Sequence, residues 1–361
     1  MRKPSLIVAI MTLLSAQLAM GQTTAATQST KEYALDLPKG AVTVRPDGLR
    51  ACGGKAVLEM SIPDSNGSDH EELSLLDLKS GKLARIGRDI VRPIEPKISS
   101  DGKYVAATSF DITKEMDRQT TLYLLDTETG KSANTVQGCS AEGCWFGQKF
   151  LFATASPKGS MGNIAAYDPK TQKAEQLPVV GIPIFGDKEG KTFLASVSPK
   201  DPKGKWRLAI FDAQGKLQKE LFDADKFDPG KVFSPTWRAV SPSIKYLAFQ
   251  TPPADKANVP NTRSRFTVYE VATGKEQSIE RDAELVDVTD SGDMLVMKIP
   301  FESDDFGFPL LMLTKDGKTI VLAKAVMLAT MDDKAIYYVT QKDDGTTLVN
   351  TTLVVMPIPT K

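Results

Sequence analysis

Short runs of apolar residues alternate with polar turns along almost the whole chain. In a recurring unit, an apolar run ends in Asp, Glu or Thr, a turn follows that contains Gly in all but one copy, and Lys opens the next run. Gly reaches positive φ without steric cost, and Asp or Thr bonds the local backbone, so each unit predicts a hairpin. The unit occurs six times, at 76–82, 125–131, 167–173, 211–216, 269–275 and 313–318.

The spacing of these hairpins indicates the fold class. Successive Asp, Glu or Thr positions are separated by 49, 42, 44, 58 and 44 residues. A repeat of about 45 residues with several short strands is typical of a β-propeller blade. We therefore predict an all-β fold, a seven-bladed propeller of four-stranded antiparallel blades. The expected blades are 41–86, 90–138, 139–180, 181–227, 232–280, 283–323 and 325–359.

The two ends of the repeat array predict how the ring closes. The last unit lacks a clear Gly-Lys turn with a fourth strand, whereas the apolar segment 32–37 precedes the first unit without a blade of its own. A ring has no free sheet edge only if its first and last blades are tied. We expect the N-terminal strand to pair with the last blade. The alternative is a complete last unit whose edge the N-terminal segment merely covers.

The N-terminus has the features of a secretory signal peptide. Arg2 and Lys3 are basic, 6–20 is largely apolar, and Ala19 and Gly21 are small residues suited to a cleavage site. The apolar run is short for a membrane anchor, and a first buried helix, the alternative, fits poorly with the polar residues that follow. We predict a signal peptide at 1–21, a flexible spacer at 22–30 and one propeller domain at 31–361. The protein is then exported, periplasmic or extracellular, and not inserted in a membrane.

Charge balance argues against nucleic acid as a partner. Lys and Arg together number 45, as do Asp and Glu, so no net field attracts polyanions. The composition and motifs also suggest no cofactor. The oligomeric state is not determined by the sequence.

Two inner segments resemble the repeat of TolB-like (WD40-like) propellers. The first is Pro96-Lys97-Ile98-Ser99-Ser100-Asp101-Gly102-Lys103, followed by an apolar strand, and a more divergent copy runs from Pro235 to Phe249. The resemblance implies a propeller architecture and says little about activity, because such repeats serve binding scaffolds and enzymes alike. TolB itself has an additional α/β domain that we do not expect here, so the resemblance does not imply the role of TolB.

Three cysteines follow the predicted signal peptide. Cys139 and Cys144 are close enough in sequence to close a small loop in an oxidising compartment, which predicts a disulfide between them. Two reduced, half-buried thiols are the alternative. Cys52 is expected to be unpaired.

Catalytic and metal-binding patterns are scarce. The single histidine, His70, cannot build a histidine cluster, and we expect it to be a solvated loop residue. Its loop offers Asp64, Asn66 and Asp69 as weak candidates for calcium, but the segment lacks the full spacing of a known calcium loop, so a plain hydrophilic hairpin tip is the favoured interpretation. The acidic pair Asp332 and Asp333 is expected in a solvated turn. We therefore predict no catalytic residue, no metal and no cofactor site.

Aromatic residues and long insertions are candidates for partner recognition. Trp145 and Trp237 lie near the starts of their units, where they either line a binding face or pack between blades. Insertions are expected at 111–120, 198–205 and 251–265, and the last carries Arg263 and Arg265. Long loops on a rigid scaffold commonly carry recognition.

Two functions follow from these residues. The first is a non-catalytic, exported propeller that binds a protein partner through its loops. The second is an enzyme or small-ligand protein that uses the centre of the ring, with Arg92, Glu95, Arg238 and Asp287 pointing inward. Converging charges with shifted pKa values at the centre would favour the second function.

Overall fold

The structure is a computed structural model in which the described residues form β-strands joined by turns and short irregular segments. The described residues are 29–38, 40–43, 48–63, 69–88, 90, 94–110, 120–155, 161–199, 204–223, 238–251, 264–298, 307–341 and 351–359. Within them no helix is long and apolar enough to cross a membrane. The predicted signal peptide and most of the spacer at 22–30 lie outside these ranges.

The first blade follows the predicted hairpin pattern. Its strands are β3 (Leu49–Cys52), β4 (Lys55–Pro63), β5 (Asp69–Asp77) and β6 (Leu83–Ile86). The short strand β2 (Val42–Thr43) pairs with β4 as well. The innermost strand is β3, which pairs with Lys55–Leu58. The Gly53-Gly54 turn between β3 and β4 allows this because both residues have positive φ.

The next three blades form one continuous ten-stranded sheet. Two long strands, β10 and β13, each serve as the outer strand of one blade and then as the inner strand of the next. The sheet consists of β7 (Ile94–Ile98), β8 (Tyr104–Phe110), β9 (Thr120–Asp126), β10 (Ser132–Phe146), β11 (Lys149–Ala155), β12 (Met161–Asp168), β13 (Lys173–Gly186), β14 (Thr192–Val197), β15 (Arg207–Asp212) and β16 (Leu217–Asp223).

Blades five and six are separate four-stranded sheets. Blade five contains β17 (Arg238–Val240), β18 (Tyr246–Thr251), β19 (Ser264–Glu270) and β20 (Glu276–Arg281). Blade six contains β21 (Ala283–Val288), β22 (Met294–Lys298), β23 (Phe308–Leu313) and β24 (Thr319–Val326).

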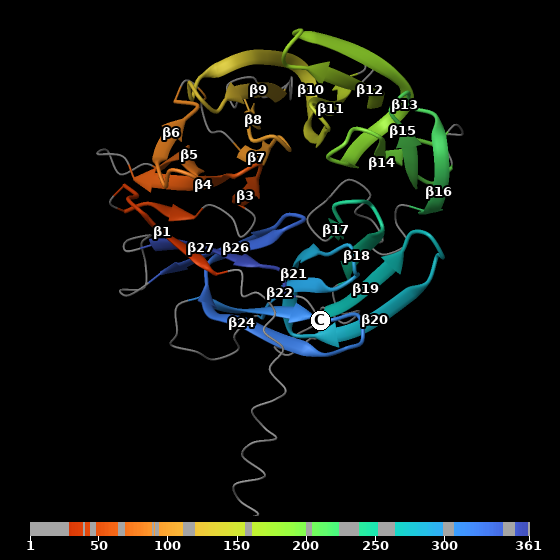
Figure 1. Cartoon of the computed structure of the whole chain (residues 1–361). Helices are drawn as coiled ribbons and strands as arrows, with labels where there is room; N and C mark the ends of the chain where they lie inside the picture. The colour runs from red at the N-terminus through yellow and green to blue at the C-terminus, as the bar shows by residue number, and fades with distance from the viewer. Residues whose placement is uncertain are drawn as a thin grey trace, which may run out of the picture.

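The last blade joins the two ends of the chain. Its strands are β25 (Leu328–Met331), β26 (Ala335–Gln341), β27 (Thr351–Pro357) and the N-terminal β1 (Lys31–Leu35). Lys31 is paired with Val355 and Leu35 with Thr351, so β1 is the outer strand of this blade. Tyr33 Oη then donates to Leu78 O of blade one at 2.6 Å. The predicted pairing of N- and C-terminal strands is confirmed, and in the described residues the strands divide into seven four-stranded units arranged as a ring (Figure 1).

The core lies between neighbouring blades. Each central strand is apolar on both faces because a blade covers it on each side, which explains continuous runs such as β14, whose four middle residues are buried. Between blades three and four, Phe193 stacks on Phe211 at 5.4 Å and meets Phe146 edge-on at 5.6 Å. Seven such clusters of buried apolar residues occur within the described chain.

The antiparallel strand order gives the ring two different faces. The turn from the first to the second strand and the turn from the third to the fourth strand lie at one end of each blade, which we name the turn face. Neighbouring first turns meet there: Gly147 N donates to Asp187 O at 3.0 Å, and Ser243 Oγ donates to Asp290 Oδ2 at 2.6 Å. The opposite end, which we name the loop face, receives the connections from the second to the third strand: 64–68, 111–119, 156–160, 198–206, 252–263, 299–307 and 342–350.

Candidate functional site at the axis of the ring

The inner strands bring several charged side chains towards the axis of the ring. Strand β3 contacts β7 and β25, and β21 contacts β17 and β25. Figure 1 shows β3, β7, β17 and β21 around the middle of the ring. We name as the axial cluster the following residues of inner strands and first turns: Arg50, Cys52, Lys188, Asp287, Asp332 and Asp333.

In the axial cluster, the carboxyl group of Asp287 has a pKa that is raised to near neutrality. Burial raises the pKa of its carboxyl to about 7, against the opposing effects of the Val288 N–H, Arg50 and the Met331 N–H; Asp332 raises it further. The Val288 N–H donates to Asp287 Oδ1 at 2.9 Å. Asp287 therefore joins blade six to blades seven and one, and it exchanges its proton near pH 7.

Replacing Asp287 with asparagine should change the pH dependence of stability. The folded pKa lies above the unfolded value near 3.8, so between about pH 4 and 7 the folded state binds a proton that the unfolded state has lost. Stability contributed by protonated Asp287 is thus present at low pH and declines as pH rises through about 7. Urea unfolding from pH 4.5 to 8 should show a flatter profile for D287N than for the parent chain, and an unchanged slope would contradict the assignment.

An ion pair crosses the turn face at the axis. Lys188, in the first turn of blade four, pairs with Asp333, in the first turn of blade seven on the far side of the ring. The hydrogen bond to Asp333 is the main cause that raises the pKa of Lys188. Asp332, the neighbouring residue, accepts from Tyr337 Oη and from the Ala335 N–H, both at 2.8 Å. Asp333 is exposed in a bend and Asp332 is partly exposed, in agreement with the predicted solvated turn, and the ring in addition brings the distant first turn of blade four to this position.

Cys52 is a poor nucleophile in this environment. Burial, followed by the negative charge of Asp332, raises the pKa of its thiol to about 11. Its Sγ donates to Ser100 O at 3.8 Å. With this pKa, the Cys52 thiol remains protonated at neutral pH. Because the thiolate is the nucleophilic form of cysteine, the protonated side chain reacts poorly. The axial cluster therefore combines the Lys188–Asp333 ion pair with one neutral thiol and one carboxyl whose pKa is raised to about 7.

Of the other three residues predicted at the centre of the ring, Glu95 is described in full, Arg238 by its backbone, and Arg92 lies outside the described residues. Glu95 lies in β7 with φ +52, and its N–H donates to Glu59 Oε2 at 3.1 Å. Arg238 begins β17, which pairs with β18, and its side chain is outside the described set. Of the two predicted residues whose side chains are described, Glu95 and Asp287, Asp287 is the one that joins the axial cluster.

Trp145 is part of the core rather than an exposed anchor. It is 9% exposed, stacks against Tyr104 at 6.3 Å and meets Phe150 edge-on at 5.3 Å. Its Nε1 donates to Lys97 O at 2.7 Å, which satisfies the indole N–H. Of the two alternatives stated for Trp145, the structure has the packed one: the residue lies between blade two and blade three.

Most of the remaining partner and metal candidates lie outside the described residues. Trp237, Arg263, Asp64 and Asn66 fall outside the described residues, and Asp69 opens β5 opposite Pro63. Within the described residues, no group of three or more His, Cys, Asp or Glu side chains could hold a metal ion. Arg265 is exposed on β19 and pairs with Glu280 at 3.4 Å.

His70 lies in strand β5 rather than in a loop. It is paired with Ile62, and its Nε2 lies 2.9 Å from Glu72 Oε1. Arg85 of β6 reaches the same carboxylate, with Nη1 3.2 Å from Oε1. The alternation of the hairpin brings these three side chains together on the outer part of blade one.

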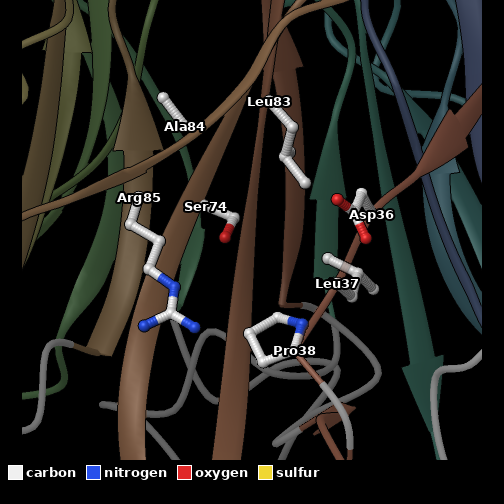
Figure 2. Close-up of a pocket in the computed structure, with 7 residues that line it drawn as sticks. All are labelled: Asp36, Leu37, Pro38, Ser74, Leu83, Ala84 and Arg85. Carbon is white, nitrogen blue, oxygen red and sulfur yellow. The ribbon is translucent and has the colours of Figure 1, made fainter.

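A groove near these residues lies on the rim of the ring. The segment that follows β1 passes over the outer strands of blade one, and Figure 2 shows Pro38 and Leu37 facing Ser74 and Leu83, with Arg85 at one side. The cavity has a volume of about 280 Å³ and is lined by Asp36, Leu37, Pro38, Ser74, Leu83, Ala84 and Arg85. It belongs to the seam that closes the ring and is remote from the axial cluster.

All three cysteines are free thiols in the structure. Cys139 and Cys144 flank a register shift in β10, and the two side chains enter different apolar clusters, between blades two and three and between blades three and four. Burial raises the pKa of Cys139 to about 11 and that of Cys144 to about 12. The predicted disulfide stays a prediction that the placement of these side chains does not favour.

Thiol titration of the purified, unreduced protein in denaturant separates the two possibilities. The structure leads us to expect three reactive thiols per chain, because each cysteine is free. A Cys139–Cys144 bridge would leave Cys52 alone to react. Reduced protein, in which all three thiols react, gives the upper reference. Protein that has been reduced and then alkylated, in which none react, gives the lower reference.

Sequence reasoning missed Arg50, Lys188 and the pair Asp332–Asp333 as members of one cluster. Each lies in or next to an inner strand, and a list of the inner strands and their first turns would have collected them. Which of these side chains cross the axis depends on the closed ring.

Comparisons with known proteins identify the architecture. Family models give no match to this chain, and curated proteins give none either. Among solved structures, the Mitotic Checkpoint Complex contains a similar chain with a TM-score of 0.50 and 11% identity, over 89% of this chain and 94% of that chain. The uncomplexed acylaminoacyl peptidase of Pyrococcus horikoshii has a TM-score of 0.51 and 14% identity, over 85% of this chain and 50% of that chain.

The chain has a β-propeller fold. TolB from Acinetobacter baumannii is also similar, with a TM-score of 0.45 and 16% identity over 77% of this chain and 66% of that chain. This chain spans about half the length of the peptidase. At these identities the likeness concerns the fold alone, since one propeller fold carries many activities.

Proposed function

We propose that this chain is an exported, non-catalytic β-propeller that binds a protein partner with its loop face. The observation that carries the proposal is the contrast between the two faces of the ring. First turns on the turn face bond to one another, and Lys188 pairs with Asp333 across the axis. The loop face instead receives connections of very different length, from 64–68 to 252–263. Variable connections on a rigid scaffold suit recognition.

Export is supported by the N-terminal sequence. A basic start, an apolar run and small residues before Gln22 are the three parts of a secretory signal. The partner would be met in the periplasm or outside the cell. Balanced charge favours a protein partner over a polyanion.

The connection 252–263 of blade five provides the sharpest test. It contains Pro252, Pro253 and Pro260 together with Lys256 and Arg263. Its C-terminal neighbour Ser264 must be kept, because Gln250 Nε2 donates to Ser264 Oγ at 2.9 Å and to Ala283 O at 3.1 Å. A Gly-Ser link should therefore replace only 256–263.

Replacement of 256–263 should abolish co-purification of the partner from the envelope or culture fluid and leave the melting temperature nearly unchanged. In the described residues, the pairing of β18 with β19 runs from Tyr246–Glu270 to Thr251–Arg265, and the Gly-Ser link leaves all of these residues in place. A matched control, K170E, changes an exposed charge on the turn face and should retain the partner. Unchanged co-purification after loop replacement would refute the recognition role of this connection, and a large loss of stability would assign it to the core.

A second candidate function is the binding of a small ligand at the axis. The observation that favours it is the titrating carboxyl of Asp287 beside Arg50, inside a ring of inner strands. Perturbed carboxyls in enclosed positions are frequent in binding sites and also in structural networks. A compound that raises the melting temperature of the parent chain but not that of D287N would support this candidate.

A further inference from the structure

The outer strand of blade six differs from the outer strands of the other blades. Five large apolar side chains are exposed among the described residues, and three of them lie on the two outer strands of blade six. These are Phe308 of β23, 37% exposed, and Ile320 and Val321 of β24, 39% and 61% exposed. The run Thr319-Ile320-Val321-Leu322-Ala323 contains no charge. Apolar residues of this kind are costly on an unpaired edge unless something covers them.

The corresponding outer strands are protected by polar or charged residues. Strand β16 carries Lys219 and Glu220, and β20 carries Glu276, Glu280 and Arg281. The first part of β13 carries Lys173 and Glu175. The other outer edges contain Arg85 in β6, Asn134 and Thr135 in β10, and Lys31 and Glu32 in β1. Strand β24 lacks this protection over its first five residues.

The free edge of β24 is well defined. Within the described residues β24 pairs only with β23, and it is the last strand of its sheet. Thr319, Ile320 and Val321 oppose Leu313, Met312 and Leu311 in regular register, and the register shifts follow after Val321. Val326 is fully buried at the other end of the strand. The exposed apolar residues thus coincide with the regular part of the edge.

Two lysines enclose this apolar edge. Lys318 precedes it, with 79% of its side chain exposed and a 3.2 Å contact to Asp316 in the same turn, and Lys324 follows it on the exposed side. An exposed pair such as Lys318–Asp316 contributes little and can exchange partners. Self-pairing of two antiparallel β24 strands centred on Val321 would set Lys318 of one copy beside Lys324 of the other. Repulsion between them disfavours a second copy as the occupant.

We propose that the edge of β24 binds an extended segment of a partner protein by β-strand addition, and that this segment has apolar residues flanked by carboxylates. Main-chain hydrogen bonds would extend the sheet of blade six, Ile320 and Val321 would be covered, and the flanking carboxylates would face Lys318 and Lys324. This surface lies on the rim of the ring, so it is separate from the loop face proposed above and does not depend on it.

The test uses a labelled synthetic peptide with glutamate at both ends and alternating valine and threonine between them. Fluorescence anisotropy with the full chain should show saturable binding. V321K should weaken binding at least about fivefold, because it removes an apolar cross-strand contact and adds a charge to the edge. Because Val321 is 61% exposed, V321K should fold normally. The matched control is L217K, which changes a 50% exposed leucine on the outer strand of blade four and should bind like the parent chain.

Charge reversal tests the flanking contacts. K324E should weaken the glutamate-flanked peptide about threefold and strengthen a lysine-flanked peptide of the same core. Hydrogen exchange should show protection gained at 319–324 when the peptide is bound. No binding of the glutamate-flanked peptide, equal loss in L217K, or protection confined to another blade would overturn the proposal. Self-association of the parent chain that V321K abolishes would overturn the assigned occupant in favour of a second copy.

Discussion

A chain that begins at Asp36, without strand β1, is expected to lose at least about 3 kcal/mol of unfolding free energy compared with one that begins at Thr30. Strand β1 buries Leu35, which is 6% exposed, against the cluster between blades one and seven. Removal of one buried leucine side chain costs about 2–5 kcal/mol in other proteins. The truncation also removes the pairing of Lys31–Leu35 with Thr351–Val355 and the Tyr33–Leu78 hydrogen bond.

Urea unfolding of the two chains measures this difference, and the chain starting at Thr30 is the control because it keeps the whole of β1. Y33F should show a smaller loss of about 1 kcal/mol, since it removes one hydrogen bond and keeps the ring. Equal stability of the two truncated chains would show that blade seven is complete with three strands, so that β1 merely covers its edge.

The second large effect is expected at Gly53, with its neighbour Gly54 as a matched control. Both have positive φ, +59 for Gly53 and +76 for Gly54, so alanine is strained at either position by about 1–2 kcal/mol. A Cβ on Gly54 meets nothing within 4 Å, whereas a Cβ on Gly53 would lie 2.3 Å from Gly102 N in the first turn of blade two. Backbone cannot rotate away as a side chain can, so G53A must displace that turn.

G53A is therefore expected to cost about 2–5 kcal/mol, the backbone strain together with an overpacking cost of about 1–3 kcal/mol. G54A should lose only the part of the unfolding free energy that comes from backbone strain, about 1–2 kcal/mol. Thermal unfolding of both variants in one buffer gives the comparison. A loss of equal size in G53A and G54A would mean that the turns of blades one and two do not pack as closely as their contact indicates.

These two predictions bear on the proposed function because they concern rigidity. The β1 seam and the contacts between first turns keep the ring closed, and a closed ring holds the loop-face connections at fixed relative positions. Recognition through several loops needs such a scaffold. Variants that open the ring should weaken partner binding together with stability, whereas replacement of 256–263 should affect binding alone.

The repeat pattern determined the architecture in this chain. Hairpin units such as 76–82 are local: the alternation of apolar residues selects the strands, and Gly with Asp or Thr selects the turns. Blade boundaries consequently agree with the structure to within a few residues in most blades. The unpaired segment at 32–37 also predicted the closure, because a strand without a blade and a blade without a strand complete each other.

The candidate site was decided by tertiary structure. Lys188 and Asp333 come from blades on opposite sides of the ring. Asp287 of blade six and Arg50 of blade one interact because the closed ring places blade seven between these two blades and brings their inner strands together. Trp145 was equally compatible with an exposed face and with the core until Tyr104 and Phe150 enclosed it. Hairpin turns and strand pairing are local to a blade, so the repeat pattern of the sequence predicts strands and turns. Which side chains converge at the axis depends on the closed ring, and no local pattern records that.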